Sequence, residues 1–310
     1  MLKRGKNINM IYVDVKGNLG NQMFIYACAR KLQAETGQKI QLNTYYLKKR
    51  YKNYEYSLGI FKLNPNIEVC DKRKLPFYAT SSSLFFRALK KIFRNTSKFN
   101  KWYYKLLSKF NVFVNDSDIY SPIKLKNRKD IYLSGFFQSE QYFNDIKEIL
   151  FDEFSIEDLK LSSENKEFLE EIKKSNSVCI SVRRGDYINN ELFKKKHFVC
   201  DDLYFENAIS KIEKQVLNPT LVYFSDDPNW VRENYKTSLP SLYEKAGNTL
   251  EEKIVLMKAC KHFILSNSSF SWWMEYLSDE DNKIVIAPVR WYADGREASI
   301  FRKEWICIEV

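Results

Sequence analysis

The amino-acid sequence predicts an α/β protein of two domains that face a cleft. With 310 residues, the chain exceeds the roughly 100–200 residues that usually share one hydrophobic core. Its residues are 45% hydrophobic and 29% charged, with nine Gly and seven Pro, a composition typical of ordered globular proteins. Short strand patterns alternate with helical patterns, most regularly in the second half. We expect domains at residues 1–160 and 161–310, with the boundary in the polar, acidic segment 155–174.

The first domain opens with the pattern of a βαβ unit. An apolar run at residues 10–15 predicts a strand, and the turn at residues 16–21 contains two glycines. A helical pattern follows at residues 22–35, and a second strand is expected at residues 39–42. A further strand and helical stretch cover residues 131–154.

The second domain has the alternation typical of a doubly wound parallel sheet with helices on both faces. Thr249 and Glu252 form a T-x-x-E capping box at the start of one predicted helix. The expected strands are residues 178–182, 221–224, 262–265 and 283–287, with a short one near Leu242, and the expected helices are residues 202–216, 228–235, 250–261 and 270–277.

A basic, aromatic insert is expected at about residues 72–115 of the first domain. No acidic residue lies between Asp71 and Asp116, and residues 84–110 interleave eight Lys or Arg with apolar side chains. One interpretation is an amphipathic insert that rests on an anionic bilayer and reaches a lipid-linked acceptor. The other is a pair of surface helices whose aromatic face packs on the domain.

Charge and cysteine usage narrow the class of protein. The formal charge of +11 suits an anionic partner such as a nucleic acid, a nucleotide-sugar or an acidic membrane surface. The six cysteines are spread without a CxxC pair, which indicates reduced thiols in a cytoplasmic protein. No signal core and no run near the ~18 residues of a membrane span is present. We expect a cytoplasmic protein, at most peripheral on the inner membrane.

Unusual polar residues follow the predicted strands of the second domain at their carboxyl ends. In parallel sheets these ends share one edge, where nucleotides and substrates bind. Four polar loops are therefore expected to converge there. They are Arg183-Arg184-Gly185-Asp186, Ser225-Asp226-Asp227-Pro228, Ser266-Asn267-Ser268-Ser269 and Pro288-Val289-Arg290-Trp291.

The two consecutive arginines are the candidates for binding a diphosphate. A pyrophosphate leaving group needs fixed positive charge, and arginine supplies a planar fork of donors that lysine does not match. Arg183 and Arg184 suit that role. The alternative is a pair of surface arginines that bridge to Asp186 or to helix ends.

Two further loops have both a ligand-binding and a structural interpretation. Asn267, Ser268 and Ser269 open a helix and can receive phosphate oxygens at its positive end, or can simply cap it. Asp226 and Asp227 can accept hydrogen bonds from the ring N–H and amine of guanine. The SDDP sequence is also a good helix start, with proline at the first position.

Two further sequence features give weaker evidence for a binding site: the glycine turn of the first domain and the possible metal ligands. Gly17 and Gly20 allow close approach of the backbone to a ligand, although a simple tight turn explains them equally well. The paired aspartates and the D-x-D spacings at Asp116 and Asp279 could bind Mg or Mn. These spacings follow no clear strand, so we expect no metal and no other cofactor.

Six motifs in order resemble those of the α1,2-fucosyltransferases of glycosyltransferase family 11, over about residues 10–292. The motifs are GNLGNQMFIYACARKL, LSGFFQSEQYF, SVRRGDY, YFSDDP, SNSSFSWWMEYL and VIAPVRWY. The resemblance implies a GT-B-like fold of two Rossmann-like domains, with the acceptor on the N-terminal domain and GDP-fucose on the C-terminal one. It also implies inverting transfer of L-fucose to the 2-hydroxyl of a terminal galactoside of an O-antigen, capsule or H-antigen-like glycan.

The resemblance also implies roles for individual residues. Asn21 and Gln22 would lie beside the fucose, Asp226 or Asp227 would contact guanine, and Gln138 would lie on the acceptor side. The implied catalytic residues are Arg183, Arg184, Asp186 and Asn21. The implied substrate-binding residues are Gly17, Gly20, Gln22, Gln138, Ser181, Asp226, Asp227, Asn267, Ser268, Ser269 and Phe270.

One position departs from the family pattern. The family motif is usually H-x-R-R-x-D, and here Ser181 stands in place of the histidine. A serine donates a hydrogen bond but does not hold a proton at neutral pH as an imidazole can. The base that would take the acceptor proton is not identified, and Asp14, at the end of the first strand, is one candidate.

Two rival functions remain at this stage. One is fucose transfer to a different acceptor, either another sugar or a protein Ser or Thr. The other is a non-catalytic, basic RNA-binding or membrane-surface protein, which would bind RNA with strong salt dependence and would not respond to guanine nucleotides.

Overall fold

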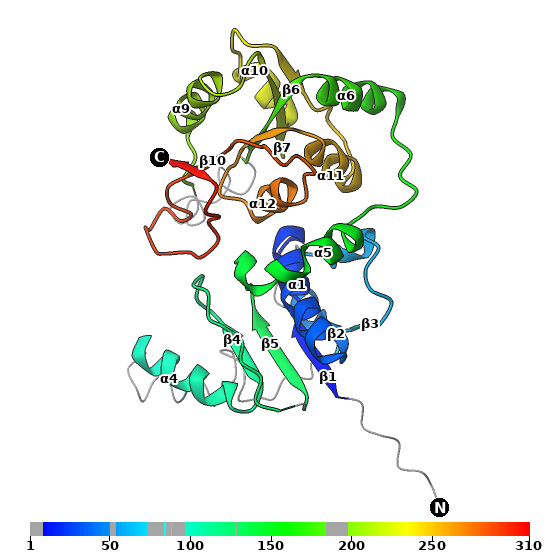
Figure 1. Cartoon of the computed structure of the whole chain (residues 1–310), viewed down its shortest axis with the longest axis vertical. Helices are drawn as coiled ribbons and strands as arrows, with labels where there is room; N and C mark the ends of the chain where they lie inside the picture. The colour runs from blue at the N-terminus through cyan, green and yellow to red at the C-terminus, as the bar shows by residue number, and fades with distance from the viewer. Residues whose placement is uncertain are drawn as a thin grey trace, which may run out of the picture. The chain divides into compact units, whose positions relative to one another are not determined.

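The chain folds into two compact units, Met1–Ser155 and Ile156–Val310. The computed structural model describes residues 9–49, 54–72, 84, 88, 97–127, 129–183 and 198–310, and Figure 1 draws the remainder as a grey trace. The sequence placed the division after residue 160, within a polar segment. The division found by the fold lies within the expected boundary segment, residues 155–174, and Ser163–Lys174 is a helix of the second unit.

Unit 1 contains a parallel sheet of five strands in the order β3-β2-β1-β5-β4. The chain runs outward from β1 to β3, then returns and places β5 on the other side of β1. The order therefore reverses between β1 and β5. The strands are β1 (Met10–Asp14), β2 (Lys39–Asn43), β3 (Ile67–Cys70), β4 (Val112–Asn115) and β5 (Ile131–Gly135).

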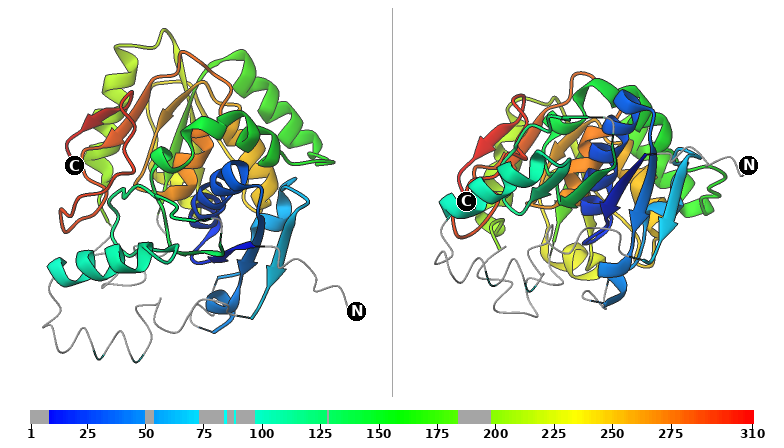
Figure 2. Two further views of the ribbon diagram at one scale, coloured as in Figure 1. Left: turned by 60° about the horizontal axis from the view of Figure 1, so that its bottom comes forward. Right: turned by 90° about the horizontal axis from the view of Figure 1, so that it is seen from below.

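Helix α1 (Leu19–Thr36) lies against β1 and β2 and is buried along most of its length (Figures 1 and 2). It ends at Gly37, whose φ of 71° is left-handed and whose N–H donates to the Gln33 carbonyl. The helix begins three residues before the expected start at residue 22, because Leu19 and Gly20 are buried and belong to its first turn.

A buried polar contact ties α1 to helix α5 (Lys147–Glu153). Glu153 accepts hydrogen bonds from the Tyr26 hydroxyl at 2.5 Å and from Arg30 Nε at 2.8 Å. Burial, together with this carboxylate, raises the pKa of Tyr26. The helical stretch expected up to residue 154 is broken here into two 3₁₀ turns and α5. The shorter elements of unit 1 are α2 (Tyr45–Lys49), η1 (Leu58–Ile60), α4 (Ser97–Ser108), η3 (Glu140–Tyr142) and η4 (Asn144–Ile146).

Unit 2 contains a parallel sheet of six strands in the order β11-β10-β9-β6-β7-β8. The order reverses between β6 and β9, as it reverses between β1 and β5 in unit 1. The strands are β6 (Asn176–Val182), β7 (Pro219–Ser225), β8 (Ser241–Tyr243), β9 (His262–Ile264), β10 (Val285–Pro288) and β11 (Ile306–Ile308). Strand β11 was not expected from the sequence.

Helices cover both faces of this sheet. Val178, Ile180 and Val182 share one core with α9 and α10, whereas Ser181 contacts α12 on the opposite face. This alternation follows from the two-residue period of a strand. The expected doubly wound α/β architecture is thus confirmed in unit 2. The helices are α6 (Ser163–Lys174), α9 (Asp202–Glu213), α10 (Pro228–Asn234), α11 (Leu250–Lys258) and α12 (Ser269–Tyr276).

The predicted capping box is present at the start of α11. Thr249 Oγ1 accepts from the Glu252 N–H at 3.2 Å, and the Glu252 carboxylate accepts from the Thr249 N–H at 2.9 Å. Among the described residues, no helix combines the length and apolar character needed to cross a bilayer.

Candidate functional site

The polar loops of unit 2 gather at the carboxyl edge of its sheet, as the sequence predicts. Strands β9, β6 and β7 are adjacent and parallel, so Ser266, Arg183 and Asp226 follow neighbouring strand ends. The loops after β6 and β9 border the point where the strand order reverses. This is the place where open α/β sheets bind nucleotides and substrates.

Arg183 and Asp226 form a charged pair at this edge. Arg183 Nε lies 4.0 Å from Asp226 Oδ2, and the two side chains are 30% and 34% exposed. Arg183 also lines a small hollow together with Phe198, Cys200 and Asn267. A guanidinium that is half-buried in this way is accessible to an anion and is only partly screened by water. The other two charged residues of the motif, Arg184 and Asp186, lie outside the described residues.

The two aspartates after β7 have different environments. Asp227 caps α10, because its carboxylate accepts from the Trp230 N–H at 3.3 Å and Pro228 occupies the first turn. Asp226 lies beside Arg183. The structural interpretation of the SDDP sequence therefore describes Asp227. The contact of Asp226 or Asp227 with a base stays a prediction.

The end of β7 is held by a buried ion pair. Glu244 accepts from the Ser225 N–H at 2.6 Å and lies 3.1 Å from Lys253 Nζ, which also donates to the Ser225 carbonyl at 2.7 Å. Burial raises the pKa of Glu244, and Lys253 opposes that shift. These contacts fix the backbone just before Asp226.

The Ser266–Ser269 segment leads into α12. Asn267 and Ser268 are buried, and Asn267 Nδ2 donates to the Trp291 carbonyl at 3.0 Å. Ser268 is the N-cap residue of α12, yet its side chain makes no capping hydrogen bond. Ordinary capping by the Ser268 hydroxyl is therefore not how this helix starts. Ser269 and Phe270 form its half-buried first turn.

Ser181, which replaces the family histidine, is joined to α12. Its hydroxyl lies 2.6 Å from the hydroxyl of Ser271, a residue that is 1% exposed. A pair of neutral hydroxyls thus links the end of β6 to α12, two residues before Arg183. This pair carries no charge, so the positive charge at the end of β6 belongs to arginine.

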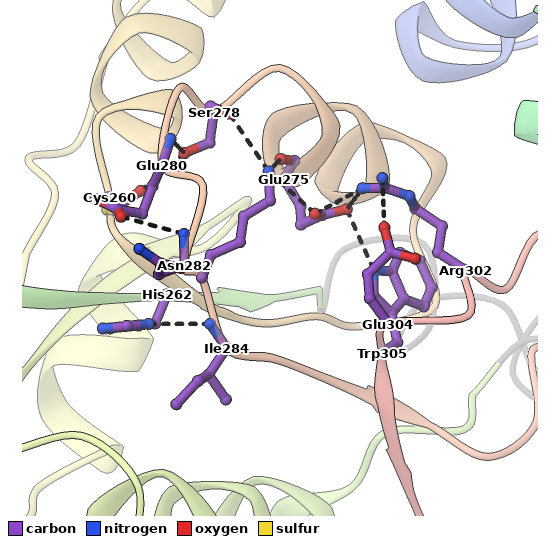
Figure 3. Close-up of polar contacts among 11 residues, drawn as sticks. Cys260, His262, Glu275, Ser278, Glu280, Asn282, Ile284, Arg302, Glu304 and Trp305 are labelled. Carbon is purple, nitrogen blue, oxygen red and sulfur yellow. Dashed lines mark hydrogen bonds and ion pairs between the residues drawn. The ribbon is translucent and has the colours of Figure 1, made fainter. Parts of the chain in front are cut away.

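Helix α12 is anchored by a buried carboxylate that the sequence reasoning missed (Figure 3). Glu275 is fully buried and accepts from Arg302 at 2.8 and 2.9 Å and from Trp305 Nε1 at 3.2 Å. Lys283 Nζ lies 3.2 Å from the same carboxylate. A buried charge is tolerated only when it is paired in this way. The available signal was a single charged residue in the aromatic-rich sequence SFSWWMEY.

His262, the first residue of β9, accepts a hydrogen bond from the neighbouring chain. His262 Nδ1 accepts from the Ile284 N–H at 3.1 Å, as Figure 3 shows. Burial lowers the pKa of His262, and the neutral imidazole is the form that can accept at this nitrogen. His262 is therefore a structural contact between β9 and the chain before β10.

The corresponding edge of unit 1 contains neutral amides. Gln138, after β5, donates to Asn21 Oδ1 at 2.7 Å, and both residues are half-buried. Gly17 has a φ of +72°, and a Cβ at this position would lie 2.4 Å from the Asn21 amide nitrogen. Glycine is therefore required at position 17. The two implied ligand residues, Asn21 and Gln138, are brought together across the reversal between β1 and β5.

Two other residues implied to bind substrate have interior positions. Gln22 is fully buried, donates to the carbonyls of Gly17 at 2.9 Å and Glu55 at 2.7 Å, and accepts from the Ser57 N–H at 3.0 Å. These bonds use both its amide hydrogens. Gly20 is buried within α1. We therefore assign Gln22 a structural role in holding the first turn against residues 55–57.

The candidate base Asp14 is buried beneath this edge. Ser134 Oγ lies 3.3 Å from Asp14 Oδ2, and Lys16 Nζ donates to Ser134 Oγ at 2.9 Å. The Lys16 ammonium also lies 5.3 Å from the centre of the Tyr46 ring. Asp14 is 0% exposed, so its carboxylate does not reach solvent in this structure. In the part of the chain that the structure describes, no three His, Cys, Asp or Glu side chains gather as a metal site would require.

Comparison with known proteins gives the family. The family model described as "Glycosyl transferase family 11" matches residues 10–309. An "Alpha-1,2-colitosyltransferase" of Escherichia coli is 31% identical, over 97% of this chain and 100% of the relative. The "O-antigen biosynthesis glycosyltransferase WbnK" of Escherichia coli is 27% identical, over 96% of this chain and 99% of the relative.

A mammalian relative matches over a shorter region. The "Galactoside alpha-(1,2)-fucosyltransferase 2" of Mus musculus is 28% identical, over 49% of this chain and 46% of the relative. The match of the family model over nearly the whole chain confirms the resemblance seen in the six motifs. This chain belongs to glycosyltransferase family 11.

Proposed function

We propose that this glycosyltransferase moves L-fucose from GDP-β-L-fucose to the 2-hydroxyl of a terminal galactoside, with inversion, and forms an α1,2 linkage. The observation that carries the proposal is the arrangement at the carboxyl edge of unit 2. Arg183, Asp226 and the start of α12 lie on adjacent strand ends at the reversal of the sheet. Membership of family 11 supplies the reaction class.

Charge development on the leaving group explains why an arginine is needed. As the bond from the sugar C1 to the phosphate oxygen breaks, the diphosphate gains negative charge and the sugar becomes oxocarbenium-like. In our proposal Arg183 and Arg184 meet that charge with bidentate hydrogen bonds. The free N–H groups at the start of α12 add a positive dipole end. Asp226 accepts hydrogen bonds from guanine. Asp186, in the same sequence motif as the two arginines, is a further proposed catalytic residue.

The acceptor is assigned to unit 1. In our proposal Asn21 lies beside the fucose as a catalytic residue and Gln138 lies on the acceptor side. Their amide groups match sugar hydroxyls, which both donate and accept hydrogen bonds. The acceptor hydroxyl loses its proton to water or to a carboxylate as the new bond forms. In our proposal the acceptor is a galactose-terminated glycan carried on a lipid, and the protein works in the cytoplasm.

A donor and acceptor screen tests this proposal. Purified protein is incubated with GDP-fucose, ADP-heptose or UDP-galactose and with free β-galactosides or lactosamines. Fucosylated galactoside from GDP-fucose alone supports the proposal. Transfer from another donor, or transfer only to a peptide Ser or Thr, contradicts it. RNA binding without any response to GDP would favour the non-catalytic alternative.

A second candidate donor is colitosyl, and the E. coli relative named for that sugar favours it. Colitose is L-fucose without its 3-hydroxyl, so both sugars fit the same diphosphate site. The two donors are separated by comparing kcat/KM for GDP-fucose and GDP-colitose. An enzyme that hydrogen-bonds the 3-hydroxyl prefers fucose strongly, because the deoxy sugar leaves that protein group unpaired.

We also propose that the reaction needs no metal, because arginine supplies the fixed charge. Treatment with EDTA, followed by dialysis, is expected to leave the rate unchanged. A rate that falls and is restored by Mg²⁺ or Mn²⁺ would show that a metal shares the charge with Arg183.

A further inference from the structure

Helix α4 of unit 1 carries apolar side chains on one buried face and on one exposed face. Tyr103 is 5% exposed and Leu107 is 4% exposed, and both pack with Val112 at the start of β4. In Figure 1 the helix runs beside β4, which is the edge strand of the sheet. This packed face holds α4 on the unit.

The second apolar face points to solvent. Trp102 is 58% exposed, Leu106 is 37% exposed and Phe110, just beyond the helix, is 64% exposed. Trp102 and Leu106 are four residues apart and therefore share one side of the helix. Phe110 follows four residues later, in the turn after the helix, and we call these three residues the apolar stripe. Large apolar side chains that share one exposed stripe mark an interaction surface more often than isolated ones do.

Exposed lysines border this apolar stripe. Lys105 is exposed, and at 100° per residue it falls on the side of the stripe away from the packed face. Lys109, just after the helix, is exposed as well. No acidic residue occurs between Asp71 and Asp116. Asp116, the first one to follow, accepts a hydrogen bond from the Tyr104 hydroxyl at 2.5 Å. The stripe is therefore flanked by positive charge.

We propose that α4 lies on an anionic lipid bilayer, with Trp102, Leu106 and Phe110 inserted among the headgroups and upper acyl chains. A helix with an apolar stripe and lysines beside it matches an interface of this kind, where lipid phosphates lie just above hydrocarbon. A tryptophan at the edge of the stripe suits the headgroup level. Surface binding of this kind would bring the enzyme to a lipid-carried glycan.

The side chains of the stripe favour a bilayer over a nucleic acid. Single-stranded nucleic acids bind to aromatic rings on which their bases stack, between cationic residues. Leu106 lies in the middle of the stripe and offers no ring for stacking, whereas an acyl chain contacts leucine and aromatic rings equally well. The stripe runs along the outside of a helix, which suits a flat interface.

The direct test uses Trp102 as a probe of insertion. Its signal is the difference in fluorescence between the wild-type protein and the Trp102→Phe variant, each mixed with vesicles. The remaining five tryptophans are less exposed: Trp230 is half-buried, and Trp272, Trp273, Trp291 and Trp305 are buried. With vesicles of phosphatidylcholine and phosphatidylglycerol, Trp102 emission is expected to shift to the blue. Brominated acyl chains should quench it.

Two sets of substitutions separate the apolar and charged parts of the surface. The triple variant Trp102→Ser, Leu106→Ser, Phe110→Ser and the double variant Lys105→Glu, Lys109→Glu should each lower the vesicle partition coefficient by about tenfold or more. The matched control is Leu203→Ser with Leu217→Ser, which changes two exposed leucines of unit 2 that are 62% and 79% exposed. This control should bind vesicles like the wild type.

Several outcomes would overturn this proposal. They are no shift of Trp102 emission with anionic vesicles, equal binding to vesicles of phosphatidylcholine alone, and equal binding by the control and the triple variant. A lipid-free dimer that the triple variant converts to a monomer would identify a second copy as the occupant. RNA binding lost in the same variant would identify a nucleic acid. Because vesicle binding needs no donor or acceptor, its failure would leave the proposed reaction untouched, and unchanged turnover of a soluble galactoside verifies the fold of the variants.

Discussion

The carboxyl edges of the two sheets have the same topology but different chemistry. Each edge lies where the strand order reverses, between β1 and β5 in unit 1 and between β6 and β9 in unit 2. In unit 2 the edge carries the half-buried pair Arg183 and Asp226. In unit 1 it carries the hydrogen-bonded amides Asn21 and Gln138. The difference separates a site suited to a charged diphosphate from one suited to sugar hydroxyls.

The contacts that hold the two sheet edges in place differ as well. In unit 2, buried ion pairs centred on Glu275 and Glu244 hold α12 and the end of β7. In unit 1, the first turn is held by neutral contacts of Gln22 and by a glycine at position 17. A charged ligand requires groups fixed before it binds, because reorganising charges during the reaction costs catalysis. The charged anchoring contacts are found on the side assigned to the donor.

The largest effect is expected from the anchor of α12. Glu275→Gln removes the charge that balances Arg302 and Lys283, and breaking a buried pair by removing one partner typically costs about 3–5 kcal/mol. Urea unfolding followed by circular dichroism measures the loss. Glu280→Gln, which changes a half-buried carboxylate in the same region, should be nearly neutral. Equal losses in both variants would mean that Glu275 does not anchor the helix.

A similarly large effect on turnover is expected from Arg183→Ala. Loss of one preorganised donor to the developing charge costs about 3–4 kcal/mol, which is a fall of roughly 10²–10³ in kcat. Affinity for GDP should fall too, while the acceptor KM stays near the wild-type value. Arg232→Ala, an exposed arginine on α10 of the same unit, is the control. Near-normal turnover in Arg183→Ala would remove this residue from the mechanism.

A smaller effect is expected on the unit 1 edge. Asn21→Ala leaves Gln138 without its 2.7 Å partner, which costs about 1–3 kcal/mol for a group that is buried when the site is occupied. This loss should raise the acceptor KM about tenfold or more and leave the Kd for GDP unchanged. If GDP affinity falls instead, the division of labour between the two edges is wrong. Steady-state kinetics with each substrate varied in turn gives the answer.

The smallest effect is expected at the position that departs from the family pattern. Ser181→Ala removes one neutral hydrogen bond to Ser271, worth about 0.5–1.5 kcal/mol. Its rate should keep the pH profile of the wild type, because a serine hydroxyl does not titrate in the neutral range. A profile that changes between pH 5 and 8 would show that Ser181 takes part in proton transfer.

The sequence predicted the scaffold of unit 2 well because periodicity and capping agree there. Thr249 and Glu252 start α11 as expected. The four polar loops follow β10, β9, β6 and β7, which are consecutive strands of the sheet. Short strands with mixed patterns escaped prediction. In β3 no residue is buried, and β11 is half-exposed, so neither has the alternation on which such predictions depend.

Contacts between residues far apart in the chain could not be predicted from the sequence pattern. The partners of Gln22 at Glu55 and Ser57 come from a separate loop, and the substrate-binding role that the family resemblance implies for Gln22 stays a prediction. Glu275 is satisfied by Arg302, Lys283 and Trp305, which follow it in the chain at unrelated spacings. The sequence shows an acidic residue in an aromatic-rich helical segment, but its partners are known only from the fold. The roles of Arg184 and Asp186 stay predictions.

The linkage of the product tests the central claim most directly. The wild-type protein is incubated with GDP-fucose and a β-galactoside, and the product is analysed by two-dimensional NMR. The account predicts an α-linked fucose whose C1 is joined to O2 of galactose, with the anomeric configuration inverted from the β donor. A fucose joined at another position, a retained β configuration, or transfer of colitose with no transfer of fucose would contradict it.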